Sequence, residues 1–376
     1  MSTMITFVAL DSHKKQHSVA VVYPNTGELA QWTVRNTQKD LAKMVRKIKR
    51  QAPGEVRFCY EAGVCGFVLK RWIEAQGCSC SVIAPSLIPV KPGERIKTDR
   101  RDARKLLSLF MAGQLTEVHA PSVEQEAARD LTRCRQAAQE DVQRNRHRLV
   151  KFLVRHGYLY TESGHWTDKH RQWLKSLVFE ESLLKEVFDQ YLTELEHSDQ
   201  RLACLDKQVV QLAQSTAYRP LVELLCCFRG IDTLTAVTLV TELFEFGRFE
   251  SPQALMSYLG LVPSESSSGD HQHRGGITKT GNRRVRRLLI QAAWNQRHGY
   301  TISRALRKRR QGQPQWAIDL ANNAGQRLRR RYRALTERGK EARKVAVAIA
   351  RELAGFIWAM LREYQVRQPH RLRKTG

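Results

Sequence analysis

The chain has 376 residues, enough for two or three domains, and no stretch approaches the roughly 20 apolar residues that span a bilayer, which excludes an integral membrane protein. Its eight cysteines form no CxxC pair and no repeated spacing, which argues against a zinc site or a disulfide framework. The net charge is +26, and 27 basic against 5 acidic residues lie between His271 and Gly376, so the composition favours a phosphate-bearing partner.

The amino-terminal part of the chain predicts a mixed α/β sheet. Apolar and β-branched runs predict strands, and amphipathic stretches between them predict helices. The order is three strands, a helix, a strand, a helix, a strand and a helix, which is the ribonuclease H-like order and not the strict alternation of a dinucleotide fold. The expected strands are residues 5–10, 18–23, 29–34, 56–60 and 80–84, and the expected helices are 38–50, 67–75 and 99–111.

The next part of the chain, residues 120–222, is predicted to be helical. Ala120-Pro121 marks its start, and Ser122 to Gln125 has the spacing of a helix capping box. Apolar residues alternately four and three apart then predict a coiled-coil seam, which we expect to pair with another subunit; packing inside one subunit is the alternative. The seam positions are Leu184, Phe188, Tyr191, Leu195, Ser198, Leu202, Leu205, Val209 and Leu212.

Residues 223–376 are expected to be mainly helical and to carry the nucleic-acid surface. Phe228 to Val237 resembles a helix-hairpin-helix turn, which presents backbone N–H groups to phosphate. Pro263 to Gly276 is too small and polar to be core, so we expect an exposed loop. The clusters 307–310 and 329–331 are dominated by arginine, which binds phosphate through a planar fork.

Four carboxylates are candidates for a metal site. Asp11 and Glu61 end the first and fourth strands, which are neighbours in a ribonuclease H-like sheet, and Asp99 and Asp102 share one face of a helix. Converging carboxylates repel one another unless cations compensate, and two Mg²⁺ ions about 3.5–4 Å apart would also activate a nucleophile and stabilise a leaving oxygen. The sequence therefore predicts metal-dependent phosphoryl transfer.

These motifs together resemble the DEDD insertion-sequence transposases of the IS110 family and its IS1111 branch, the relatives of pilin-gene invertases that are described as bridge-RNA-guided recombinases. The resemblance rests on Asp11, on Glu61 in Tyr-Glu-Ala-Gly, on Asp99 and Asp102 in Lys-Thr-Asp-Arg-Arg-Asp, and on Ser-Ser-Gly at 267–269 with Ile-Thr-Lys-Thr-Gly-Asn at 277–282. It implies a RuvC-like domain over residues 1–119, a helical coiled-coil domain over 120–222 and a transposase domain over 223–376.

By the same resemblance, Asp11, Glu61, Asp99 and Asp102 are the catalytic and metal-binding tetrad, and Ser268 is the nucleophile. Because three serines stand in a row at 266–268, Ser267 is the alternative. A serine hydroxyl needs its proton removed or its oxygen placed at a metal before it attacks, and Arg274 or Lys279 would neutralise the transition state. The residues expected to bind nucleic acid are Arg274, Lys279, Asn282, Arg283, Arg284, Arg286 and Arg287.

The implied partners are donor and target DNA, a non-coding guide (bridge) RNA and further copies of the chain, as a dimer that assembles to a tetramer. We expect a cytoplasmic, nucleoid-associated bacterial protein with no membrane partner.

Three other functions stay open. A hydrolytic nuclease such as a junction resolvase would use the same tetrad with water as nucleophile, and a non-catalytic nucleic-acid scaffold would make the tetrad accidental. A tyrosine recombinase, for which Tyr300, Tyr332 and Tyr364 are present, explains none of the four acids.

Overall fold

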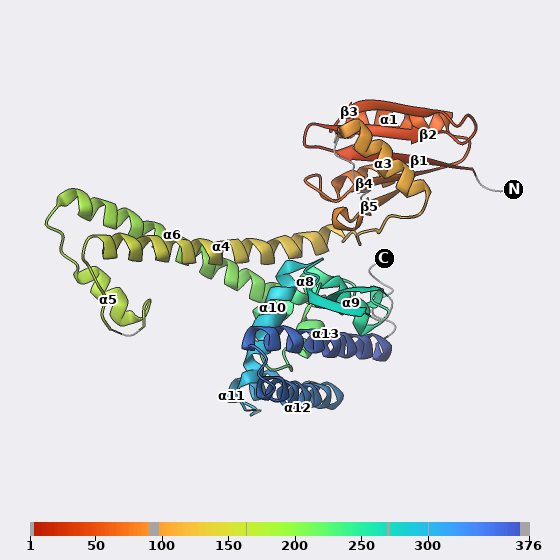
Figure 1. The fold of residues 1–376 in the computed structure, drawn as a ribbon. Coiled ribbons are helices and arrows are strands. Elements are labelled where there is room, and N and C mark those ends of the chain that lie inside the picture. Colours follow the sequence, from red (N-terminus) through yellow and green to blue (C-terminus); the bar gives the residue numbers. More distant parts are fainter. Residues whose placement is uncertain (1–3, 90–97, 163, 269–270, 300, 369–376) are drawn as a thin grey trace. The chain divides into compact units, whose positions relative to one another are not determined.

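The computed structural model describes residues 4–89, 98–162, 164–268, 271–299 and 301–368, and the chain divides into two compact units, Met1–Ser122 and Val123–Gly376 (Figure 1). One core cluster of the second unit holds Val209 and Ala213 together with Val222 and Leu224. The division expected between residues 222 and 223 therefore falls inside one packed unit, and it stays an expectation.

The first unit contains a five-stranded mixed sheet in the order β3-β2-β1-β4-β5. The first three strands are antiparallel neighbours, and β4 runs parallel to both β1 and β5. This sheet, with three helices, confirms the mixed α/β prediction for the first unit. The strands are β1 (Ile5–Ser12), β2 (Gln16–Val22), β3 (Leu29–Arg35), β4 (Glu55–Glu61) and β5 (Ser79–Ile83), and the helices are α1 (Gln38–Gln51), α2 (Val68–Glu74) and α3 (Asp99–Met111), with a 3-10 turn η1 (Pro85–Leu87).

Each face of the sheet packs against a different set of helices, because successive side chains of a strand point to opposite faces. Val8 and Leu10 of β1 belong to the cluster that contains the apolar faces of α1 and α2. Ala9 of β1 and Cys59 of β4 belong to the cluster that contains Ala103 and other residues of α3. Residues at odd positions at the end of β1 and β4 therefore share the α3 side of the sheet.

The second unit begins with two long helices that pack on each other, α4 (Val123–Arg155) and α6 (Ser182–Gln214), joined through α5 (Asp168–Ser176). The heptad positions Phe188 and Leu195 of α6 are buried in one cluster with Leu149 and Phe152 of α4. The seam thus has its partner in its own chain, as the alternative prediction of packing inside one subunit had it. The seam therefore gives no reason to expect a contact between subunits. A heptad pattern shows that an apolar stripe is covered, but it does not say by which chain.

The rest of the second unit is mainly helical, and α13 lies at the centre of its core with buried residues such as Ile349 and Leu353. The elements are α7 (Arg219–Leu225), α8 (Thr233–Leu243), η2 (Phe246–Arg248), α9 (Pro252–Tyr258), β6 (Pro263–Ser268), β7 (His271–Ile277), α10 (Arg283–Trp294), η3 (Asn295–Arg297), α11 (Arg304–Arg309), α12 (Gln315–Glu337) and α13 (Ala342–Arg367). Within the described ranges, no helix is both long enough and apolar enough to cross a membrane.

The segment expected to be an exposed loop is in fact an antiparallel hairpin, formed by β6 and β7. Its described side chains are exposed apart from the partly buried Pro263 and Ile277 at its base, so neither strand shows the alternation of apolar and polar residues that marks a half-buried strand. The prediction of a loop was wrong because hydrophobic periodicity cannot reveal a hairpin whose described side chains beyond the base are exposed on both faces.

Candidate active site

Two of the four predicted carboxylates lie at the carboxyl ends of two neighbouring strands, β1 and β4. Leu10 of β1 pairs with Tyr60 of β4, and Asp11 and Glu61 each follow by one residue on these parallel strands. Both positions are partly buried. By the alternation of the strands, Asp11 follows Ala9 and Glu61 follows Cys59 on the side of the sheet that α3 covers. The strand order that predicted their proximity is therefore present.

The other two carboxylates, Asp99 and Asp102, lie in the first turn of α3. Thr98 caps this helix, with its side chain accepting a hydrogen bond from the backbone N–H of Arg101. Gln31 of β3 donates to the backbone carbonyl of Arg100 at 2.9 Å, which fixes the start of the helix to the sheet. Carboxylates in the first turn are stabilised in their charged form by the helix dipole, so both acids are suited to meet a cation.

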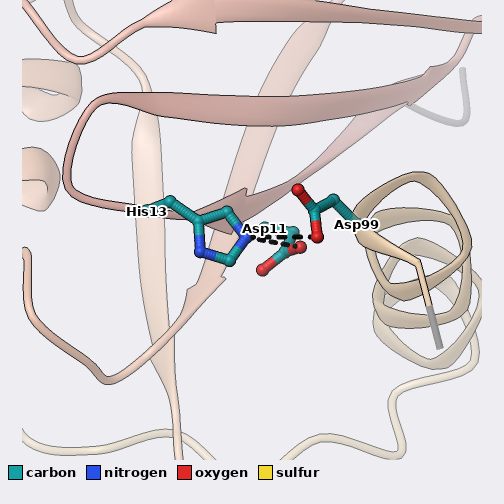
Figure 2. Close-up of side chains that lie close together, drawn as sticks. All are labelled: Asp11, His13 and Asp99. Atoms are coloured by element: carbon teal, nitrogen blue, oxygen red, sulfur yellow. Dashed lines mark hydrogen bonds and ion pairs between the residues drawn. The ribbon is translucent and has the colours of Figure 1, made fainter.

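Asp11, His13 and Asp99 come together in the structure, as Figure 2 shows. The His13 Nε2 atom lies 3.2 Å from Asp11 Oδ2 and 3.5 Å from Asp99 Oδ1. One ligand atom from each of the three residues lies within 4.8 Å of the others. The geometry therefore joins the end of β1 to the start of α3 through an imidazole that the sequence prediction did not include.

The electrostatics of this cluster are those of crowded acids. Burial, the largest cause, raises the pKa of Asp11; His13 opposes this shift, and the charges of Asp99 and Asp102 add to it. Asp102 is thus close enough to Asp11 to act on its charge. A divalent cation would relieve this repulsion, and carboxylate oxygens with an imidazole nitrogen form a donor set that fits one. The residues present therefore fit a metal site.

His13 could have been noticed from the sequence, because it stands two residues after the acid that ends the first strand. Its backbone is fixed by the turn that follows, where its N–H donates to the Gln16 carbonyl at 3.0 Å. The side chain of Asn36 reaches the carbonyl of Lys14 in the same turn at 3.2 Å. A histidine in a basic turn has many uses, however, and only the placement of α3 brings it to Asp99.

The predicted nucleophile lies in the other unit. Ser268 ends β6, and its backbone pairs with His271 of β7. Gly269 and Asp270, which separate them in the sequence, lie outside the described residues, and for Ser267 and Ser268 only the backbone is described. The structure therefore places the serine at the far end of the hairpin from its root at Pro263 and Ile277.

The seven residues expected to bind nucleic acid separate into two groups. Arg274, Lys279, Arg283 and Arg287 are exposed. Asn282 instead caps α10 and donates to Glu242, and Arg284 contacts Gln136 and lies 3.9 Å from Glu242. Arg286 is buried, and its Nη1 donates to the carbonyls of Leu259 and Thr280 at 2.8 Å each. The assignment of Arg286 to a nucleic-acid contact is therefore withdrawn, because its guanidinium already binds the backbone.

The arginine clusters show the same division. Arg310 is buried and donates twice to the carbonyl of Cys227 and once to Asn322. Arg329 donates to the carbonyls of Gln296 and Arg297. Arg307 and Arg330 are exposed. Part of the positive charge of this region therefore stabilises loops within the chain, and the exposed remainder is the part that a polyanion would meet.

The segment expected to resemble a helix-hairpin-helix turn connects α7 to α8. Gly230 has a φ of +86°, and a Cβ there would meet the Ala292 carbonyl at 2.5 Å, so the turn requires glycine. Asp232, which stands where a second glycine would be usual, caps α8 by accepting from the N–H of Thr235 at 2.8 Å. Asp232, the residue that departs from the helix-hairpin-helix pattern, is thus a helix cap.

A mixed sheet of this strand order, with carboxylates at the ends of β1 and β4 and on a helix across the same face, defines a ribonuclease H-like domain of the DEDD type. Comparison with known proteins agrees: residues 8–157 match the DEDD transposase model of IS110 elements, and residues 222–307 match the model described as the transposase IS116/IS110/IS902 family.

Individual relatives extend this agreement over nearly the whole chain. The chain is 38% identical over 362 residues to y4qE of Sinorhizobium fredii, named as a transposase, covering 95% of this chain and 88% of that one. It is 33% identical over 346 residues to the transposase for insertion sequence element IS1533 of Leptospira borgpetersenii, covering 90% and 99%. It is 23% identical to the transposase for insertion sequence element IS1111A of Coxiella burnetii, covering 77% and 73%. The chain belongs to the IS110 family of transposases, which are enzymes that cut and rejoin DNA.

Proposed function

We propose that this transposase is a recombinase that cuts DNA by joining a serine to it, with Ser268 as the nucleophile and the four carboxylates holding divalent metal. The observation that carries the proposal is the convergence of Asp11 and Asp99 across the face of one sheet, with Asp102 close enough to raise the pKa of Asp11. Glu61 completes the set from the end of β4.

The metal-binding side chains would come from Asp11, Glu61, Asp99 and Asp102, and the proposed metal is Mg²⁺, as two ions. His13 is a further ligand candidate, since its Nε2 lies between two of the carboxylates. When bound, the metal supplies Lewis acidity at the scissile phosphate. The chain itself holds the carboxylates in place: β1 and β4 through their register, and α3 through its Thr98 cap.

In the proposed reaction, the Ser268 Oγ attacks the phosphorus of a phosphodiester and loses its proton to a base. An Oγ–P bond forms, the P–O bond to one deoxyribose breaks, and the released oxygen takes up a proton. The phosphoserine ester conserves the energy of the broken bond, so a hydroxyl of a second strand reverses the step and releases the serine without ATP. Exposed cations near the hairpin root, Arg274 and Lys279, would neutralise the phosphate.

The partners of the reaction are proposed to be donor and target DNA, a non-coding guide RNA, and further copies of the chain. The acids and the serine belong to different compact units, which supports a site completed by assembly, with the acids of one chain and the serine of another. The proposed assembly is a dimer that pairs to a tetramer. Since the heptad seam is covered within the chain, another surface has to supply these contacts.

Trapping the covalent intermediate tests the proposal. Labelled DNA carrying the element ends is reacted with full-length wild-type, Ser268→Ala and Ser267→Ala proteins, and the adduct is mapped by mass spectrometry. We expect the adduct at Ser268 in the wild type and in Ser267→Ala, and none in Ser268→Ala. Adduct loss in Ser267→Ala alone would move the nucleophile by one residue. Cleavage without any adduct would make the protein a hydrolytic nuclease that uses the same carboxylates.

A further inference from the structure

Glu242, near the end of α8, is a buried acid that none of the chemistry above uses. Its side chain is only 1% exposed. Arg133 of α4 binds it with two hydrogen bonds, from Nε at 2.7 Å and from Nη2 at 2.9 Å. The amide of Asn282 donates to the same carboxylate at 2.8 Å. Three segments that are far apart in the sequence therefore meet at one carboxylate.

The charge state of this acid follows from its partners. Burial would raise the pKa of Glu242, but the hydrogen bonds from Arg133 and Asn282 and the charges of Arg133 and Arg129 outweigh burial and hold the pKa below its ordinary value. The carboxylate is therefore ionised. Removing one of its partners would cost much free energy, because it would leave a buried charge with too few hydrogen bonds and no water to replace them. Such a network fixes its members in one arrangement.

Asn282 connects this network to the serine hairpin. Its side-chain oxygen accepts from the backbone N–H groups of Arg284 and Val285, which caps α10, while its amide binds Glu242. Only four residues, 278–281, separate Asn282 from the end of β7. Holding Asn282 thus holds the chain where it leaves the hairpin.

The root of the hairpin is packed backbone against backbone. A Cβ at Gly281 would come within 1.8 Å of the Tyr258 carbonyl, and one at Gly260 within 2.4 Å of the Thr280 carbonyl. The Thr278 N–H donates to the Val262 carbonyl at 2.9 Å, and buried Arg286 joins Leu259 to Thr280. The root therefore has little freedom to adjust by itself. Glu242 connects it to α4 through Asn282 and Arg133, beside the contact of Arg284 with Gln136 of α4.

We propose that Glu242 is a positioning residue for strand cleavage: through Asn282 it fixes the root of the β6–β7 hairpin, and through Arg133 it fixes that root to α4. The inference rests on the proposed function, because the hairpin matters as the carrier of Ser268. Glu242 acts through these neighbours and does not touch the reacting atoms. Since misplacement of reacting groups by about 1 Å can cost on the order of a hundredfold in rate, a loosened root slows cleavage without removing any catalytic group.

The chain offers variants that separate positioning from simple stability. Glu242→Gln keeps the size of the side chain but removes its charge, and Asn282→Ser keeps a good helix cap but removes the amide donor to Glu242. Arg135→Gln is the matched control, because Arg135 of α4 makes an ion pair of the same 2.7 Å length, with Asp206 of α6, away from the hairpin.

The measurements use full-length protein, purified with the RNA it carries from cells that contain the whole element, and a supercoiled plasmid bearing the element and its flanking DNA. Glu242→Gln and Asn282→Ser are expected to form the serine adduct on the order of 10- to 100-fold more slowly, with the Kd for the plasmid DNA within about twofold of wild type. Amide hydrogen exchange should quicken over residues 278–282, and Arg135→Gln should behave as wild type.

Unchanged adduct formation in both variants would overturn the inference. So would a slowing that only follows a lower Tm and weaker DNA binding, since that is the signature of a purely structural residue. If the wild-type protein forms no adduct at all, the proposed function fails instead, and the hydrogen exchange of residues 278–282 still decides whether Glu242 holds the root.

Discussion

The two candidate reacting groups of this transposase are held in opposite ways. The carboxylates of the first unit lie at the ends of regular elements, where strand register and a helix cap place them. The serine of the second unit lies at the end of a hairpin that is packed at its root and whose described side chains beyond the root are exposed. The carboxylates are therefore fixed directly by the elements that carry them, whereas the serine is fixed through the distant root of its hairpin.

The largest effect is expected at the carboxylates. Asp11→Asn and Asp102→Asn should each lower Mg²⁺-dependent DNA cleavage by at least on the order of a thousandfold, because each removes the charge of a proposed metal ligand. Cleavage of a labelled plasmid and thermal unfolding measure this. Asp40→Asn is the control, since Asp40 is also a first-turn acid of the same unit, on α1. Undiminished cleavage by a folded Asp11→Asn protein would refute the tetrad.

An intermediate effect is expected at four exposed cations of the hairpin and of the chain that follows it. Replacing all four by Gln should weaken DNA binding at low salt and reduce the slope of log K against log salt by up to about 3 to 4, because each phosphate contact releases counterions. The four are Arg274, Lys279, Arg283 and Arg287.

Removing four exposed lysines from α5 and α6 is the matched control for total charge, and it should change the slope much less. These are Lys169, Lys175, Lys185 and Lys207. Equal slopes for the two quadruple variants in a fluorescence titration would mean that only the net charge of the protein matters. The four cations at the hairpin would then contribute no more to DNA binding than the four lysines.

The smallest effect is expected at His13, and it concerns the choice of metal. An imidazole ligand favours Mn²⁺ over Mg²⁺, which prefers oxygen. His13→Gln should therefore lower Mn²⁺ affinity by up to about tenfold and leave Mg²⁺ affinity nearly unchanged. Pulsed paramagnetic resonance of the Mn²⁺-loaded protein should show nitrogen modulation in wild type and in the exposed control His147→Gln, and none in His13→Gln. Modulation that persists in His13→Gln would exclude this ligand.

The sheet of the first unit could be predicted because apolar and β-branched runs mark its strands, and two of these runs lead to an acid, as β1 ends near Asp11 and β4 at Glu61. Once the strand order was recognised, the neighbourhood of these two acids followed from parallel pairing. The start of α3 at Asp99 also agreed, because Thr98 is a good cap.

Other parts could not be predicted, for physical reasons that differ. The heptads of α6 predicted a covered stripe, but α4 of the same chain and a second subunit offer equivalent apolar partners. Exposed and buried arginines look alike in a sequence, although Arg283 faces solvent and Arg286 binds backbone carbonyls. Nothing near Glu242 in the chain indicates that Arg133, 109 positions away, is its partner.

The close packing of backbone against backbone at Gly260 and Gly281 holds the hairpin at its root, which acts as a pivot about which the hairpin can tilt. At about 3.3 Å per residue, the five steps from Pro263 to Ser268 give an arm of roughly 16 Å. A tilt of only about 3–4° at the pivot then moves the serine by roughly 1 Å, a displacement that alone can change a rate by on the order of a hundredfold. Small rotations at the root are thus amplified at the tip, so contacts at the root, far from Ser268, decide where that residue lies.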